Sequence, residues 1–174
     1  MKSPNYFIIK PLNDARYDNI RKYGDNEFVI SSSTEDHRIV NRYAIVQSVP
    51  MNYNGAIKPG DTVIVHHNVF RITYGYDGLP KSSWSFYKDN IFLVSLDQIF
   101  CHKSDEEDWK SIYPYVFIKP NGTELEGTVI YTPKEIINVF PGDTITHRPE
   151  MEYEFKFDDE KLYRMKYTDL CLKL

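Results

Sequence analysis

The sequence predicts an all-β protein in which one small unit is used twice. A Pro-Gly-Asp-Thr turn occurs at 59–62 and again at 141–144, and β-branched residues follow both times. Pro pre-sets φ near about −65° and Gly supplies a positive φ, so the pair favours a tight turn. The β-branched residues after it favour a strand. No segment has the pattern of a helix longer than two turns.

The segments around the turn are also repeated, in the same order. Tyr-Phe-Ile-Ile-Lys-Pro at 6–11 matches Tyr-Val-Phe-Ile-Lys-Pro at 115–120, and the segment at 90–101 matches the one at 161–172. The second copy is shorter before and after its turn. Connections that vary in length between kept strands are typical of loops on a common scaffold. We therefore predict a duplicated unit.

In the first copy, the connections are longer and more polar than the strands. Residues 12–27 are charged and polar, which predicts a long loop or a short irregular helix, and residues 67–90 predict a long hairpin or excursion. Residues 96–98 predict a one-turn element. Strands are predicted at 6–10, 43–49, 62–66 and 91–95.

The acidic run Ser-Asp-Glu-Glu-Asp at 104–108 is the clearest change of composition and predicts a solvated linker. We place the domains at 1–103 and 113–174, with the linker at 104–112. Residues 152–157 alternate strictly, which predicts a half-buried strand with its aromatic residues on one face. Further strands are predicted near 115–119, 126–131, 143–147, 161–166 and 170–173.

Composition limits the classes of partner. The net charge of −4 and pI near 5.7 give no basic surface for nucleic acid. No apolar run approaches the roughly 20 residues of a membrane span, and no apolar segment follows Met1, so we expect a cytoplasmic protein. Cys101 and Cys171 lie at nearly equivalent strand positions, which favours core residues over a disulfide.

No catalytic, cofactor or metal motif is present, so we expect no enzymatic activity, no cofactor and no metal site. Asp61 and Asp143 follow Pro-Gly, where a carboxylate accepts backbone N–H bonds; we prefer this role to a catalytic dyad. The structural turn residues are Pro59, Gly60, Asp61, Pro141, Gly142 and Asp143. His66 and His67 would point to opposite faces of a strand and could not share a metal. An enzyme that binds carbohydrate through exposed aromatic residues remains a minor alternative.

The first copy resembles the GroES co-chaperonins, and among them those of tailed phages. Ile-Lys-Pro-Leu-Asn-Asp at 9–14 is similar to the family's opening Ile-Arg-Pro-Leu-His-Asp. The strand at 44–49, the Lys-Pro-Gly-Asp-Thr-Val-Ile-Val segment at 58–65 and the closing segment at 91–101 follow in the family's order. The similarity covers residues 6–103, and more thinly 115–173.

The resemblance implies two small, partly open β-barrels in tandem that assemble into a homo-oligomeric ring. It also implies a mobile loop at 15–30 whose apolar triplet docks on a chaperonin. By position the triplet is Phe28, Val29 and Ile30, and Tyr17 and Ile20 are further candidate contacts in the same loop. The alternative is that the triplet is an edge strand of the barrel. A short apolar anchor on a polar loop gives specificity, while ordering entropy keeps affinity modest.

Two features depart from the family. Residues 15–20 are more polar than the family's second strand, and the second copy has no room for a mobile loop. Two functions therefore stay open. One is a co-chaperonin that caps a chaperonin ring in the cytoplasm, which would be the host cytoplasm for a phage protein. The other is a virion structural or adaptor protein that binds neighbouring virion proteins. Both predict self-association through edge strands.

Overall fold

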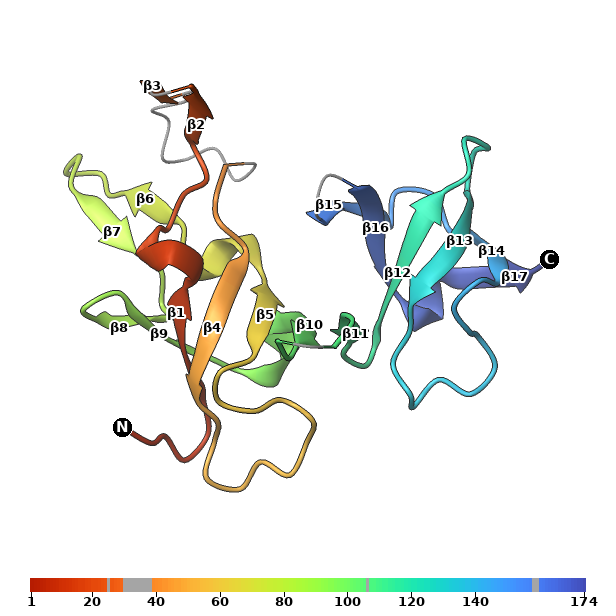
Figure 1. The fold of residues 1–174 in the computed structure, drawn as a ribbon, viewed down its shortest axis with the longest axis horizontal. Helices are drawn as coiled ribbons and strands as arrows, with labels where there is room; N and C mark the ends of the chain where they lie inside the picture. Colours follow the sequence, from red (N-terminus) through yellow and green to blue (C-terminus); the bar gives the residue numbers. More distant parts are fainter. Residues whose placement is uncertain (25, 30–38, 106, 158–159) are drawn as a thin grey trace. The chain divides into compact units, whose positions relative to one another are not determined.

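The chain is all-β, and its sheets are antiparallel. The computed structural model describes residues 1–24, 26–29, 39–105, 107–157 and 160–174. The helical parts of this described chain are four single 3-10 turns. The protein folds as two compact units, Met1–Ile99 with Lys103–Glu107, and Phe100–His102 with Asp108–Leu174 (Figure 1).

The first unit contains one main sheet and two separate hairpins. Its 3-10 turns are η1 (Leu12–Asp14), η2 (His67–Val69) and η3 (Leu96–Gln98). Its strands are β1 (Phe7–Pro11), β2 (Ile20–Tyr23), β3 (Asn26–Val29), β4 (Tyr43–Ser48), β5 (Thr62–Val65), β6 (Ile72–Tyr74), β7 (Pro80–Ser82), β8 (Phe86–Lys88) and β9 (Ile91–Val94). Neighbouring strands of the main sheet follow the order β5-β4-β1-β9-β8, while β2 pairs with β3 and β6 pairs with β7.

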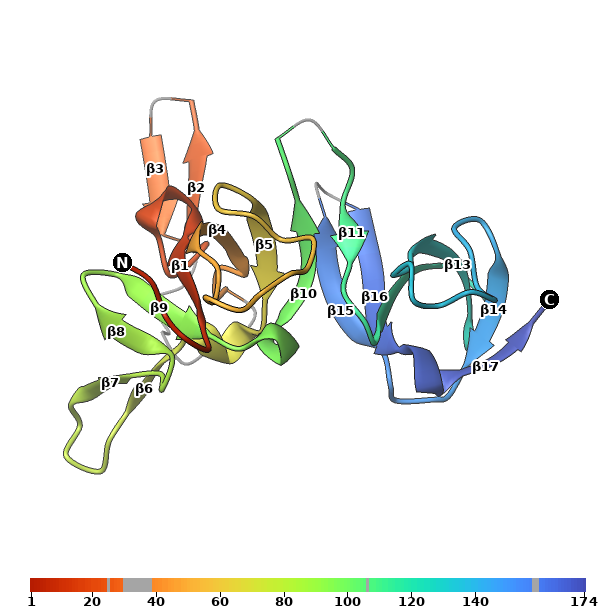
Figure 2. The same cartoon turned by 90° about the horizontal axis from the view of Figure 1, so that it is seen from below.

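The main sheet buries apolar side chains at alternate positions in β4 and β9 and at consecutive positions in β1 and β5. Ile9, Phe70 and Phe92 are fully buried, and the rings of Phe70 and Phe92 meet edge to face with their centroids 4.7 Å apart. Burial of such large side chains contributes about 1.5–3 kcal/mol each. The hairpins β2–β3 and β6–β7 stand apart from this core (Figures 1 and 2).

The chain then passes through β10 (Ile99–Lys103) and β11 (Lys110–Ser111), which pair through Cys101 with Ser111 and His102 with Lys110. In the second unit, the 3-10 turn η4 (Tyr167–Asp169) precedes the last strand. Its strands are β12 (Tyr115–Pro120), β13 (Glu126–Tyr131), β14 (Thr144–His147), β15 (Tyr153–Phe157), β16 (Glu160–Lys166) and β17 (Leu170–Lys173). Their order in the sheet is β15-β16-β12-β13-β14-β17.

The two units have the same strand order. The series β8-β9-β1-β4-β5 corresponds strand by strand to β15-β16-β12-β13-β14. The irregularity in pairing falls at the same place, between Ile8 and Ile9 in β1 and between Phe117 and Ile118 in β12. Residues that the sequence repeat equates therefore occupy equivalent positions in the two sheets.

Hydrogen bonds around the Pro-Gly-Asp turns repeat as well. Gly60 N–H donates to Val46 O at 2.8 Å, and Gly142 N–H donates to Val129 O at 2.8 Å. The two glycines have φ of 96° and 94°, in the region that side chains with a Cβ rarely adopt. This is the reason that Gly is needed at both turns.

The second unit packs different side chains on the two faces of its sheet. One face carries an aliphatic cluster that includes Val116, Ile118 and Met165. The other carries aromatic rings, with Phe117 and Phe157 centroids 5.1 Å apart. β15 confirms the predicted alternation, because Phe155 and Phe157 are buried while Glu154 and Lys156 are exposed.

Several expectations change. None of the sheets formed by the described residues closes into a barrel, so the two partly open barrels stay a prediction. The predicted loop at 12–27 contains η1, all of β2 and the start of β3, because these strands satisfy each other's backbone groups locally.

The predicted linker at 104–112 contains β11, and Phe100–His102 belong to the second unit. Among the described residues, no helix is long and apolar enough to cross a membrane.

Candidate partner-binding site

The hairpin β2–β3 carries three of the five residues predicted to bind a partner. Ile20 pairs with Val29, and Arg21 pairs with Phe28. The exposed fractions are 49% for Ile20, 53% for Phe28 and 64% for Val29. Because side chains alternate along a strand, Ile20 and Val29 lie on one face of the hairpin and Phe28 lies on the other. The hairpin therefore presents apolar groups on both faces.

The other two predicted contacts are placed differently. Ile30 lies outside the described residues. Tyr17 precedes the hairpin, is half-buried, and its hydroxyl accepts a 2.7 Å hydrogen bond from Ile72 N–H. Phe28 and Val29 pair with β2 in a two-stranded sheet, so they do not form an edge strand of the main sheet.

Backbone bonds close the base of the segment that carries the hairpin. Tyr17 forms an antiparallel bridge with Val40, and Asp18 N–H donates to Ile39 O at 2.7 Å. The Asn41 side-chain amide donates to Ala15 O at 2.7 Å. Hydrogen bonds between residues 15–18 and 39–41 thus hold together the two ends of the segment that carries the hairpin.

Arg16 joins this base to the second insertion. Its Nε donates to Phe70 O at 2.9 Å, and its NH1 donates to Ser82 Oγ at 3.2 Å. Its guanidinium lies 5.2 Å from the centroid of the Phe92 ring and 5.6 Å from that of Phe86. Partial burial lowers the pKa of Arg16, and the charge of Tyr17 opposes this effect. Arginine stays protonated in proteins, so the group is a half-buried cation with directed donors.

The hairpin β6–β7 is a second surface with exposed aromatic residues. Tyr76 at its tip is fully exposed, as is Trp84 after β7, and Leu79 is 61% exposed. Gly78, with φ of 71°, forms the turn. Aromatic rings presented in this way are typical of protein interfaces. The carbohydrate alternative also depends on exposed aromatic residues, without naming these two.

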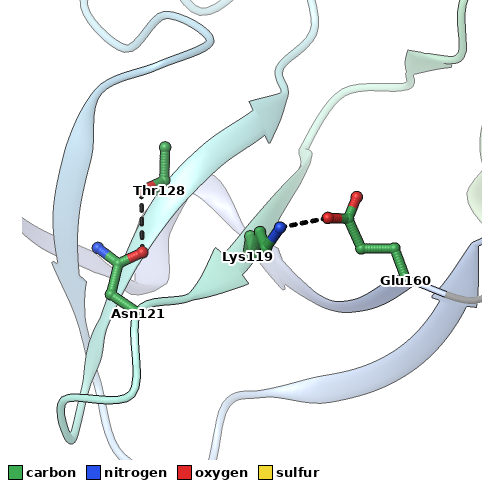
Figure 3. Close-up of polar contacts among 4 residues, drawn as sticks. All are labelled: Lys119, Asn121, Thr128 and Glu160. Atoms are coloured by element: carbon green, nitrogen blue, oxygen red, sulfur yellow. Dashed lines mark hydrogen bonds and ion pairs between the residues drawn. The ribbon is translucent and has the colours of Figure 1, made fainter.

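The second unit has a short polar connection at the position of the β2–β3 insertion. Residues 121–125 join β12 to β13, and Thr128 Oγ1 donates to Asn121 Oδ1 at 2.9 Å (Figure 3). Lys119 Nζ forms an ion pair with Glu160 on the neighbouring strand β16 (Figure 3). Gly127 is required here, because a Cβ would lie 2.8 Å from Lys119 O. Only the first unit therefore carries an apolar hairpin at this place among the described residues.

The carboxylates that follow Pro-Gly are engaged within their own turns. Asp61 Oδ2 accepts from Lys58 N–H at 2.9 Å, and Asp143 Oδ2 accepts from Phe140 N–H at 2.8 Å. Lys173 Nζ lies 2.6 Å from Asp143 Oδ2. The Lys173 bond, followed by the Phe140 backbone bond, lowers the pKa of Asp143. The carboxylates of Asp61 and Asp143 thus stabilise their own turns through these hydrogen bonds.

Two expectations about histidine and cysteine were wrong in part. β5 ends at Val65, so His66 and His67 are not on a strand, and their rings lie 4.2 Å apart. In the described ranges, no group of three metal-ligating residues occurs. Cys101 is buried as expected, whereas Cys171 is exposed and lines an open cavity of about 260 Å³.

Sequence reasoning missed the hairpin itself and Arg16. The sequence did contain a signal for the hairpin, because Gly24, a turn residue, lies between two short segments that contain Ile20 and Phe28. In the structure Gly24 adopts φ of 60°. Arg16 had no comparable signal, because its acceptors lie far away in the sequence. No protein-family model matches this chain, and no curated protein sequence matches it.

Proposed function

We propose that this protein is a non-enzymatic, ring-forming partner of a chaperonin and that hairpin β2–β3 is its docking element. The observation that carries the proposal is the exposure of Ile20, Phe28 and Val29 on a hairpin that the second unit lacks among the described residues. Large exposed apolar side chains on a short element fit an apolar groove of a protein. The resemblance to the GroES co-chaperonins names the class of that protein.

The oligomeric ring is part of the same proposal. Strands β15 and β17 are the outer strands of the second sheet, and Leu172 on β17 is 62% exposed. Edge strands with exposed apolar residues can pair with a second copy. Closed rings are one of the few ways in which identical copies satisfy all such edges.

The test is capture of the purified protein by a host chaperonin in the presence of nucleotide, together with its mass in solution. The unchanged protein should be captured as a ring-sized oligomer. Phe28→Asp should abolish capture and leave the circular dichroism spectrum unchanged. Ile137→Asp is the matched control, because Ile137 is an exposed residue of the second unit at 82%. Equal capture of Phe28→Asp and the unchanged protein would remove Phe28 from the site.

A virion structural or adaptor protein is the second candidate. It is favoured by the second unit, which keeps the sheet without the hairpin, and by the exposed aromatic residues Tyr76 and Trp84. An adaptor needs several surfaces for different neighbours, and these residues offer a surface apart from β2–β3. A monomer that no chaperonin captures, and that assembles only with other virion proteins, would favour this function over the first.

A further inference from the structure

The first unit contains two insertions that the second unit reduces to short connections. Residues 12–42 between β1 and β4 correspond to 121–125, and residues 66–85 between β5 and β8 correspond to 148–152. The sheet around them is otherwise the same in strand order. The two insertions are therefore the structural features that distinguish the first unit, and one of them carries the docking hairpin.

The two insertions are bonded to each other at their bases. Arg16 in the first insertion donates to the Phe70 and Arg71 carbonyls at 2.9 and 3.5 Å, and to Ser82 Oγ at 3.2 Å, all in the second insertion. Tyr17 adds a fourth bond, because its hydroxyl accepts from Ile72 N–H at 2.7 Å. Two consecutive residues thus make every one of these links.

Backbone contacts of the same two residues face the segment that carries the hairpin. Arg16 O accepts from Asn41 N–H at 3.0 Å, and Tyr17 forms a bridge with Val40. Residues 16–17 therefore lie between the second insertion and residues 39–41, where the first insertion returns to the sheet. The hairpins β2–β3 and β6–β7 leave this base in different directions (Figures 1 and 2), so the link acts at the base and not along the hairpins.

We infer that Arg16 and Tyr17 are positioning residues of the docking hairpin, and that the second insertion is a buttress that fixes the direction in which β2–β3 leaves the sheet. The inference rests on the proposed function. Tyr17, expected as a partner contact, acts instead through its bond to Ile72. If the base is already held in place in the free protein, the hairpin loses less conformational entropy when it docks.

The chemistry of Arg16 predicts that lysine does not replace it. The planar guanidinium directs three donors at three acceptors while its central carbon lies over the Phe86 and Phe92 rings. A lysine ammonium is a compact, strongly hydrated charge and does not reproduce this fork or stack in the same way. Arg16→Lys should therefore behave as a loss of the link even though it keeps the charge.

The experiment compares the full chain with Tyr17→Phe and Arg16→Lys, with Tyr6→Phe as a matched control on an exposed tyrosine. Amide hydrogen exchange of the free protein should be up to about tenfold faster at Ile72 in Tyr17→Phe, since one hydrogen bond is lost. The affinity for the chaperonin should fall by up to about tenfold in both variants. This loss should be in the association rate, because the hairpin's own contact residues are unchanged.

Three outcomes would overturn the inference, and they are distinguishable. Unchanged exchange at Ile72 would show that the Tyr17 bond does not hold the second insertion. Faster exchange with unchanged capture would show that the base does not position the hairpin, while the proposed function would stand on Phe28→Asp. Failure of the unchanged protein to be captured would overturn the proposed function and the docking role of the base together.

Discussion

Asp61 Oδ1 accepts a 2.9 Å hydrogen bond from Ser104 Oγ, which ties the Pro-Gly-Asp turn of the first unit to the segment that follows β10. Asp143, the equivalent residue, is tied in the same sense to Lys173 on the last strand, with 2.6 Å between Oδ2 and Nζ. In both units the turn carboxylate thus has two functions. It closes its own turn, and it holds the segment at the end of the repeat.

Asp61→Ala should destabilise the first unit by about 1–3 kcal/mol. Asp61 is only 5% exposed, and its removal leaves the Lys58 N–H and the Ser104 hydroxyl without this acceptor at a partly buried place. Urea unfolding followed by circular dichroism measures the change. Ser104→Ala is the control and should cost less, because it removes one bond and leaves the turn closed. An equal loss in the two variants would contradict the primary role of the Lys58 bond.

The Asp143–Lys173 pair predicts a dependence of stability on acid pH. The pKa of Asp143 is lowered in the folded protein by Lys173 and by Phe140 N–H. Its contribution to stability is therefore present above the unfolded pKa of about 3.9 and is lost as the pH falls through the folded pKa. Lys173→Met should flatten this part of the profile of unfolding midpoint against pH. A profile unchanged by Lys173→Met would show that the pair contributes nothing in solution.

The two cysteines should react with an alkylating reagent at very different rates. Cys101 is fully buried, and burial raises the pKa of its thiol well above the usual value, so little thiolate forms. Cys171 is exposed on β17. Mass spectrometry should find one label under native conditions, on Cys171, and two labels in denaturant. Rapid native labelling of Cys101 would contradict the burial of β10.

The strands of the repeat could be predicted to within about one residue, because β-branched runs and Pro-Gly turns are local signals. β13 and β17, for example, begin and end where the sequence placed them. The hairpin β2–β3 was missed because its residues 20–23 include Arg and Lys instead of an apolar alternation. The hairpin lies apart from the core (Figures 1 and 2), and Ile20, Phe28 and Val29 are exposed on it, so burial does not set the pattern of these apolar residues.

The site could be predicted only in part, for a similar reason. Phe28 and Val29 were predicted as partner contacts from their place in the chain; both are exposed on β3, and their contact with a partner stays a prediction. Arg16 was not found, because its role depends on Phe70 and Ser82, which only the folded chain brings near. The exposure of Cys171 could not be predicted either, since nothing in the sequence says which strand is an edge.

Phe100→Ala should destabilise the second unit by about 3–5 kcal/mol. Phe100 is 1% exposed, its ring centroid lies 4.7 Å from that of Tyr115, and the Arg164 guanidinium lies 4.5 Å from its centroid. In a Trp84→Phe background, fluorescence of Trp109 reports this unit, because Trp109 packs on Phe157 with centroids 5.6 Å apart. Phe140→Ala, at an exposed site, is the control. Equal unfolding midpoints for the two variants would contradict the assignment of Phe100 to the second unit.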